Sequence, residues 1–184
     1  MKPGRGKQKG SSFERDICSR LSRWLTDGSR NDVLWRSAMS GGRSVEAACG
    51  DISAVAEEGF PFTNKFVIEC KHYNEQIFAP LVFHQYSQLN KWWPKLLNES
   101  LKFKRHPMLI VKQQNKPTLV VVSGATSRRV GIRWSTLWVD SQYLVFFALL
   151  DNLLASGDFK SYVRRPGNGE AIGRVRPPLV QQTQ

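Results

Sequence analysis

Hydrophobic positions along the chain recur with two different spacings. Five apolar residues near the start lie at helical spacing: Phe13, Ile17, Leu21, Trp24 and Leu25. Ser11 or Ser12 can cap this helix at its start, and Asp27-Gly28 ends it. The rest of the chain is dominated by short, nearly continuous apolar runs, which predict strands.

The apolar runs predict an α/β (α+β) fold. Strands are expected at residues 32–37, 51–56, 65–71, 107–113, 117–124 and 142–148. The second and third of these strands are expected to form an antiparallel hairpin with a loop near residues 57–64. Residues 80–100 have helical spacing with a kink or break at Pro94, residues 125–135 form a basic loop, and residues 150–156 form a short helix. The order α-β-β-β-α-β-β, with a C-terminal β-α extension, predicts a central mixed sheet flanked by helices.

Composition divides the chain into one domain with two basic ends. Residues 1–10 are predicted to be a flexible arm, residues 11–163 a single domain, and residues 164–184 an irregular tail rich in Pro, Gly and Arg. The arm carries four basic residues and the tail a net charge of +3, so together they hold over half of the total +12.

The charge of +12 and the isoelectric point near 10 favour a polyanionic partner, with nucleic acid as the first candidate. A basic protein without such a partner, or one bound to an anionic membrane, is the alternative. No run of about 18 apolar residues is present, and no signal peptide is apparent, so we expect an intracellular protein without a membrane span. Three widely spaced cysteines argue against a disulfide framework and against a zinc site.

One strand contains an acid and a base on the same face. In "FVIECKHY", Glu69 and Lys71 are two residues apart and therefore point to the same side of the strand. A surface ion pair is one interpretation, and a metal site with a lysine beside the reacting group is the other. The second requires more acids: Asp51 opens the neighbouring strand, and Glu14 lies at the predicted head of the first helix. There, Glu14 could equally stabilise the helix N-terminus.

These motifs together resemble the PD-(D/E)xK nuclease superfamily, and most closely the archaeal-type Holliday junction resolvases. The similar segments cover roughly residues 9–124 and occur in the family's order: "KGSSFERDI", "RSAMSGG", "GDISAV", "VIECK" and "HPMLIVKQQNKPTLVVV". The chain departs from the pattern at Gly50, where proline usually precedes the aspartate. It also departs in residues 125–163, which extend beyond the compact resolvase.

The resemblance implies a restriction-endonuclease-like core, phosphodiester hydrolysis with Mg²⁺ (or Mn²⁺ in its place), and branched DNA as substrate in recombination. Glu14, Asp51, Glu69, Lys71 and Ser40 would then be the catalytic residues. The first three of these would ligate metal, together with the backbone carbonyl of Cys70, because Mg²⁺ prefers hard oxygen ligands. Ser40 is equally well interpreted as a turn residue before two glycines.

DNA contacts are expected mostly at phosphates, from Lys7, Lys9, Arg36 and Arg43. The resemblance also implies a homodimer. Trp92 and Trp93 could contribute to its interface or stack on bases, although core packing of a helix explains them at least as well. Two alternatives to a resolvase remain: another DNA-processing or restriction-like nuclease of the superfamily, and an inactive DNA-binding module of the same fold.

Overall fold

The computed structural model describes residues 5–37, 49–83 and 85–165, with side chains described from residue 9 onward. Its helices are α1 (Arg5–Leu25), η1 (Glu57–Gly59), α2 (Phe60–Thr63), α3 (Ala79–Val82), α4 (Leu89–Lys102), α5 (Gly124–Ser127), α6 (Leu150–Ala155) and α7 (Gly157–Arg164). Its strands are β1 (Leu34–Arg36), β2 (Ile52–Ala54), β3 (Phe66–Tyr73), β4 (His106–Gln113), β5 (Thr118–Ser123), β6 (Ser135–Val139) and β7 (Tyr143–Leu149).

A five-stranded mixed sheet in the order β3-β4-β5-β7-β6 forms the centre of the fold. Strands β3 and β4 are parallel, and all other neighbours are antiparallel. Two parallel strands need a long crossover, and here α3 and α4 provide it. The predicted α+β class with a mixed sheet between helices is therefore confirmed, and the architecture is that of a restriction-endonuclease-like core.

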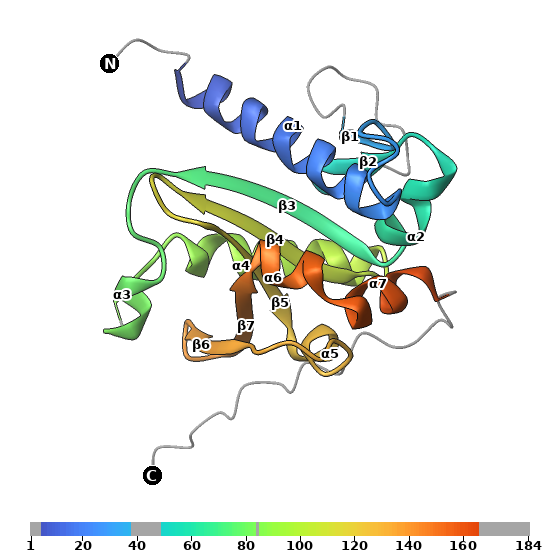
Figure 1. Cartoon of the computed structure of the whole chain (residues 1–184). Coiled ribbons are helices and arrows are strands. Elements are labelled where there is room, and N and C mark those ends of the chain that lie inside the picture. The colour runs from blue at the N-terminus through green and yellow to red at the C-terminus, as the bar shows by residue number, and fades with distance from the viewer. Residues whose placement is uncertain (1–4, 38–48, 84, 166–184) are drawn as a thin grey trace.

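The two faces of this sheet have separate hydrophobic cores. Helix α1 packs on β3 from one face, where α6 and α7 also lie, and α4 covers the other face (Figure 1). In β3, Ile68 and Cys70 belong to the core on the α1 side, whereas Val67 belongs to the core on the α4 side. This alternation places Glu69 and Lys71 on the α4 side. None of the helices in the described ranges is long and apolar enough to cross a membrane.

The first helix begins earlier than its sequence predicts. It was expected to start at Ser11 or Ser12 after a flexible arm, but α1 begins at Arg5, so residues 5–10 are helical. Extending an existing helix costs little per residue, and the packed turns from Phe13 onward supply the nucleus. Glu14 consequently lies in the middle of α1 rather than at its head, and the expected interaction with the helix N-terminus does not apply.

The predicted hairpin of the second and third strands is wrong. β2 pairs with β1 in a separate two-stranded antiparallel sheet. The connection to β3 contains η1 and α2 instead of a turn. The reason is Phe62, which is fully buried against Phe66 and Phe159 and draws the connection into the core.

Other differences concern the helix near Pro94 and the C-terminal region. The predicted helix over residues 80–100 is divided, but the break falls between α3 and α4, and Pro94 lies inside α4. Part of the expected basic loop is helix α5. Strand β6 and helix α7 were not anticipated, and β7 is inserted in the sheet between β5 and β6.

The tryptophans occupy both core and surface positions, whereas the cysteines are core residues. Trp93 is only 2% exposed, and Trp92 is partly buried with its ring 5.5 Å from that of Tyr73, so core packing explains both. Trp138, by contrast, is 56% exposed on β6. All three cysteines are buried and unpaired.

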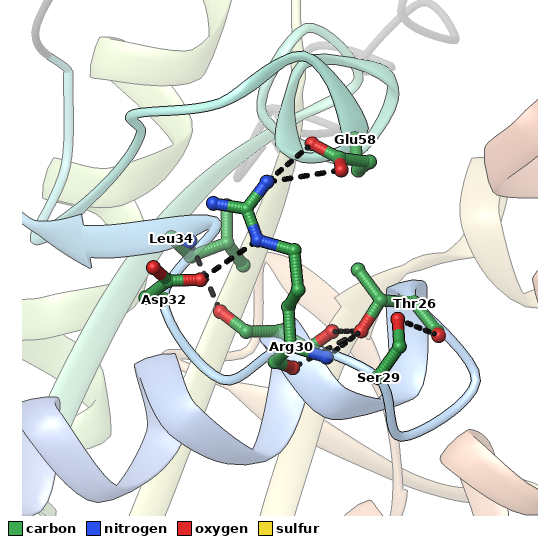
Figure 2. A network of polar contacts seen from close by, with 7 residues as sticks. Thr26, Ser29, Arg30, Asp32, Leu34 and Glu58 are labelled. Atoms are coloured by element: carbon green, nitrogen blue, oxygen red, sulfur yellow. Dashed lines mark hydrogen bonds and ion pairs between the residues drawn. The ribbon is translucent and has the colours of Figure 1, made fainter.

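A polar network joins the end of α1 to the β1 segment and η1 (Figure 2). The Arg30 guanidinium contacts Asp32 and Glu58, each at 3.0 Å, and the Thr26 hydroxyl accepts a hydrogen bond from the Arg30 backbone N–H. The buried Ser22 hydroxyl accepts a bond of 3.0 Å from the Leu34 N–H. These contacts set the position of β1, and through it β2, relative to α1.

We predict that Phe159→Ala destabilises the whole domain. Phe159 is fully buried on α7, where its ring stacks on Trp24 at 5.0 Å and contacts Phe66 at 6.0 Å. The free energy of unfolding in urea should fall by about 3–5 kcal/mol. Phe83→Ala, at a side chain 71% exposed, is the control and should change it by less than about 0.5 kcal/mol. A small loss for Phe159→Ala would show that α7 is not integral to the core.

Candidate active site

Two carboxylates and a lysine converge where β2 begins beside the edge strand β3. Lys71 Nζ forms a short ion pair with Glu69 and lies 3.9 Å from Asp51 Oδ2. All three side chains are largely buried, and that of Glu69 is only 18% exposed. The structure therefore brings together three residues that are separated by up to 20 positions in the sequence.

Asp51 is held against β3 by two hydrogen bonds. Its backbone N–H donates to the Ile68 carbonyl at 2.7 Å, and its Oδ2 accepts from the Cys70 N–H at 2.8 Å. The N–H and C=O of one strand residue point to the same side, so the Cys70 carbonyl faces this edge as well. The edge thus presents Asp51, Glu69 and one backbone carbonyl together.

Burial makes both acids harder to ionise. Burial raises the pKa of Asp51, and the charges of Glu14 and Glu99 add to this effect, while the Cys70 N–H and Lys71 oppose it. Burial and the charge of Asp51 likewise raise the pKa of Glu69 in spite of its bond to Lys71. Two buried carboxylates of raised pKa are a site at which bound positive charge is favoured.

Lys71 supplies part of that positive charge. Burial disfavours its ammonium form, but the hydrogen bond to Glu69 and the charges of Glu69 and Asp51 outweigh burial and raise the pKa of Lys71. Lys71 therefore stays protonated beside the two acids. The alternative of a simple surface ion pair does not fit, because the pair is largely buried and touches a third charged group.

Glu14 approaches the same edge from the α1 side and has a partner of its own. Its Oε2 accepts a hydrogen bond from Arg36 Nε at 2.5 Å. The charge of Glu14 still contributes to the raised pKa of Asp51. Arg36, predicted to bind DNA, is thus also the residue that neutralises Glu14 beside the site.

Of the remaining predicted site residues, the structure describes the side chain of Lys9 but not those of Lys7, Ser40 and Arg43. Ser40 and Arg43 lie outside the described residues, as does the side chain of Lys7. Lys9 is exposed on α1. Burial of the His72 ring lowers the pKa of His72, and the positive charges of Lys9 and Lys112 lower it further. His72 and Lys112 are opposite each other on β3 and β4, so positive charge gathers at this end of the two strands.

One acidic residue at the site, Glu99, is not singled out by any sequence pattern. Glu99 on α4 accepts a hydrogen bond of 3.0 Å from the Gly50 N–H, and its charge acts on both Asp51 and Glu69. It occupies an ordinary polar position of an amphipathic helix, so no pattern in the sequence distinguishes it. Only the crossover that places α4 under β3 brings it to the site.

The donor atoms fit a hard divalent cation. Within residues 5–37, 49–83 and 85–165, no three His, Cys, Asp or Glu side chains are already arranged as a metal cluster. Carboxylates of Asp51 and Glu69 with a backbone carbonyl are nevertheless the oxygen ligands that Mg²⁺ prefers. A cation bound by both acids would compete with the Lys71 ammonium for Glu69.

A mixed sheet between helices, with Asp51 before one strand and Glu-x-Lys within the next, defines the class as the PD-(D/E)xK nuclease superfamily. Residues 5–137 match the model of the family described as "Phage putative PDDEXK endonuclease". The match covers well over half of the chain, and the chain belongs to this family. Comparisons with curated proteins and with solved structures found no match.

Family membership supports nuclease as the class of this protein. The family's description names neither a metal nor a particular DNA structure, so the resemblance to archaeal-type Holliday junction resolvases stays a prediction.

We predict that Lys71→Met raises the pKa of Glu69 further. The lysine contact is a cause that lowers this pKa, so its removal leaves burial and the Asp51 charge unopposed. Titration of the Glu69 side-chain carboxyl by ¹³C NMR measures the change. Lys91→Met, at an exposed position on α4, is the control and should leave the Glu69 titration where it is. An unchanged Glu69 pKa in Lys71→Met would contradict the assigned contact.

Proposed function

We propose that the chain is a Mg²⁺-dependent endonuclease that hydrolyses phosphodiester bonds in DNA, with Mn²⁺ able to replace Mg²⁺. The observation that carries this proposal is the convergence of Asp51, Glu69 and Lys71 at the edge of β3. Membership in an endonuclease family supports the reaction type, and the oxygen-rich donor set supports the metal.

Each residue of the site has a role that follows from its chemistry. When bound, Mg²⁺ would polarise the phosphate and increase the acidity of its water. Asp51, Glu69 and the Cys70 carbonyl would hold the cation. Lys71 remains protonated, so it would orient the attacking water or stabilise negative charge on the phosphate. Glu14 would bind a second cation or a water of the first.

The DNA would approach over α1 and the ends of β3 and β4. Lys9 is exposed there, and Lys112 adds charge from β4. Arg36 lies beside Glu14, which is in the middle of α1. Lys7, Arg43 and a phosphate contact from Ser40 complete the proposed contacts. Such contacts to phosphate give affinity without sequence selectivity.

We further propose branched DNA, such as a four-way junction, as the substrate and a homodimer as the active form. The resemblance to archaeal-type Holliday junction resolvases supports both. Resolving a four-way junction requires two incisions, and one site per chain cannot readily make both in one pose. A two-fold symmetric dimer would place two copies of the site on opposing strands.

We predict that Asp51→Asn and Glu69→Gln abolish cleavage and leave DNA binding intact. Each substitution removes charge that would hold the cation and preserves side-chain shape, so the single-turnover rate in Mg²⁺ should fall by at least about 100-fold. Fluorescence anisotropy with labelled DNA in Ca²⁺ should give a nearly unchanged Kd. Glu75→Gln, at an exposed loop position, is the carboxylate control and should cleave at the wild-type rate. Wild-type activity in Asp51→Asn would show that the assigned site is wrong.

We predict preferential cleavage of a four-way junction over a linear duplex of the same sequence, and only when Mg²⁺ or Mn²⁺ is added. Paired nicks on opposing strands, mapped with end-labelled DNA, and a dimer mass by light scattering are the expected results. A monomer that cuts both substrates equally would assign the chain to the restriction-like or DNA-processing nucleases. Binding without cleavage under every metal condition would assign an inactive DNA-binding module.

A further inference from the structure

Glu99 reaches the backbone immediately before Asp51 from the opposite side to Glu14. Its Oε1 accepts a hydrogen bond of 3.0 Å from the Gly50 N–H. Glu99 lies on α4, near the C-terminal end of a helix packed on β3 and β4. The half-buried Glu99 side chain of α4 thus holds the main chain at Gly50, directly beside the site.

Gly50 has a backbone conformation that needs such support. Its φ is +72°, in the left-handed region, and a Cβ at this position would lie 2.4 Å from the Ile68 carbonyl oxygen. Only glycine fits where the chain comes this close to β3, and glycine has the largest conformational freedom of all residues. The bond to Glu99 restricts this freedom on one side, and the bond of Asp51 N–H to Ile68 restricts it on the other.

Loss of the Glu99 acceptor would affect Asp51 directly. The Gly50 N–H would lose its acceptor in a partly buried place, and a buried backbone donor without a partner is unfavourable. The segment would relax by rotating about Gly50, which is bonded to Asp51. Small displacements of a reacting group are enough to slow an enzyme strongly.

We propose that Glu99 is a positioning residue for Asp51. Its carboxylate fixes the Gly50 peptide, and this peptide aims the Asp51 carboxylate at the site. The inference rests on the proposed function only in that Asp51 is taken to act in DNA cleavage.

The test compares three variants of the full chain. Glu99→Met removes the acceptor and keeps the length of the side chain and a good helix former. Glu99→Gln removes the charge and keeps a carbonyl oxygen that can accept from Gly50. Asn98→Met makes a similar change at the adjacent exposed position of α4 and serves as the control.

The first measurement is amide hydrogen exchange of Gly50 by NMR, without DNA or metal. We expect exchange about tenfold faster in Glu99→Met, and within about threefold of wild type in Glu99→Gln and Asn98→Met. The second is the single-turnover rate of DNA cleavage in saturating Mg²⁺. It should fall about tenfold or more in Glu99→Met, with unchanged DNA affinity, and return to within about threefold of wild type in Glu99→Gln.

Three results would overturn the inference. The first is unchanged Gly50 exchange in Glu99→Met, and the second is faster exchange with a wild-type cleavage rate. The third is equal loss of rate in Glu99→Met and Glu99→Gln, which would assign the effect to charge and not to the hydrogen bond. Failure of the proposed function is seen separately: the wild type would then cleave DNA under no metal condition, or Asp51→Asn would cleave as well as the wild type. The Gly50 exchange rates would still test the hydrogen bond in either case.

Discussion

The site depends on one crossing of the main chain, where residues 49–51 lie against the outer edge of β3. β3 is the edge strand of the central sheet, so its outward backbone groups need partners from outside the sheet. The Asp51 N–H donates a hydrogen bond to the Ile68 carbonyl, and the Asp51 carboxylate accepts one from the Cys70 N–H. The contacts that close the sheet edge are therefore the same contacts that position the acidic residue.

The charges at this edge are balanced against burial. Partial burial beside the hydrophobic cores on the two faces of β3 raises the pKa of Asp51 and that of Glu69. Lys71 compensates part of the charge from within the same strand. Electrostatic interactions are stronger in a partly buried site, because the effective dielectric constant there is lower than in water. A protonated lysine and a bound cation would therefore both act more strongly on a phosphate at this site than in water.

Residues beyond the family match complete the fold that carries the site. The match ends at residue 137, but β7 lies between β5 and β6 in the sheet, and α6 and α7 cover the α1 face. Phe159 of α7 packs against Phe62 and Phe66, next to the start of β3. Without these elements, the core beneath β3 would be open on one side.

The sequence by itself determined the local features of this protein. Continuous apolar runs predicted β3, β4, β5 and β7, because buried strands need apolar residues on both faces. The one-face geometry of Glu69 and Lys71 follows from the two-residue period of a strand. The order of the motifs along the sequence also indicated Asp51 as the partner of Glu69 and Lys71.

Tertiary structure decided what depends on contacts between distant segments. Helix α1 extends to Arg5 because its packed turns nucleate it, and the expected hairpin is replaced by η1 and α2 because Phe62 is buried. Glu99 joins the site only because α4 crosses beneath β3. No local pattern encodes these outcomes, since each is set by which surfaces the folded chain buries together.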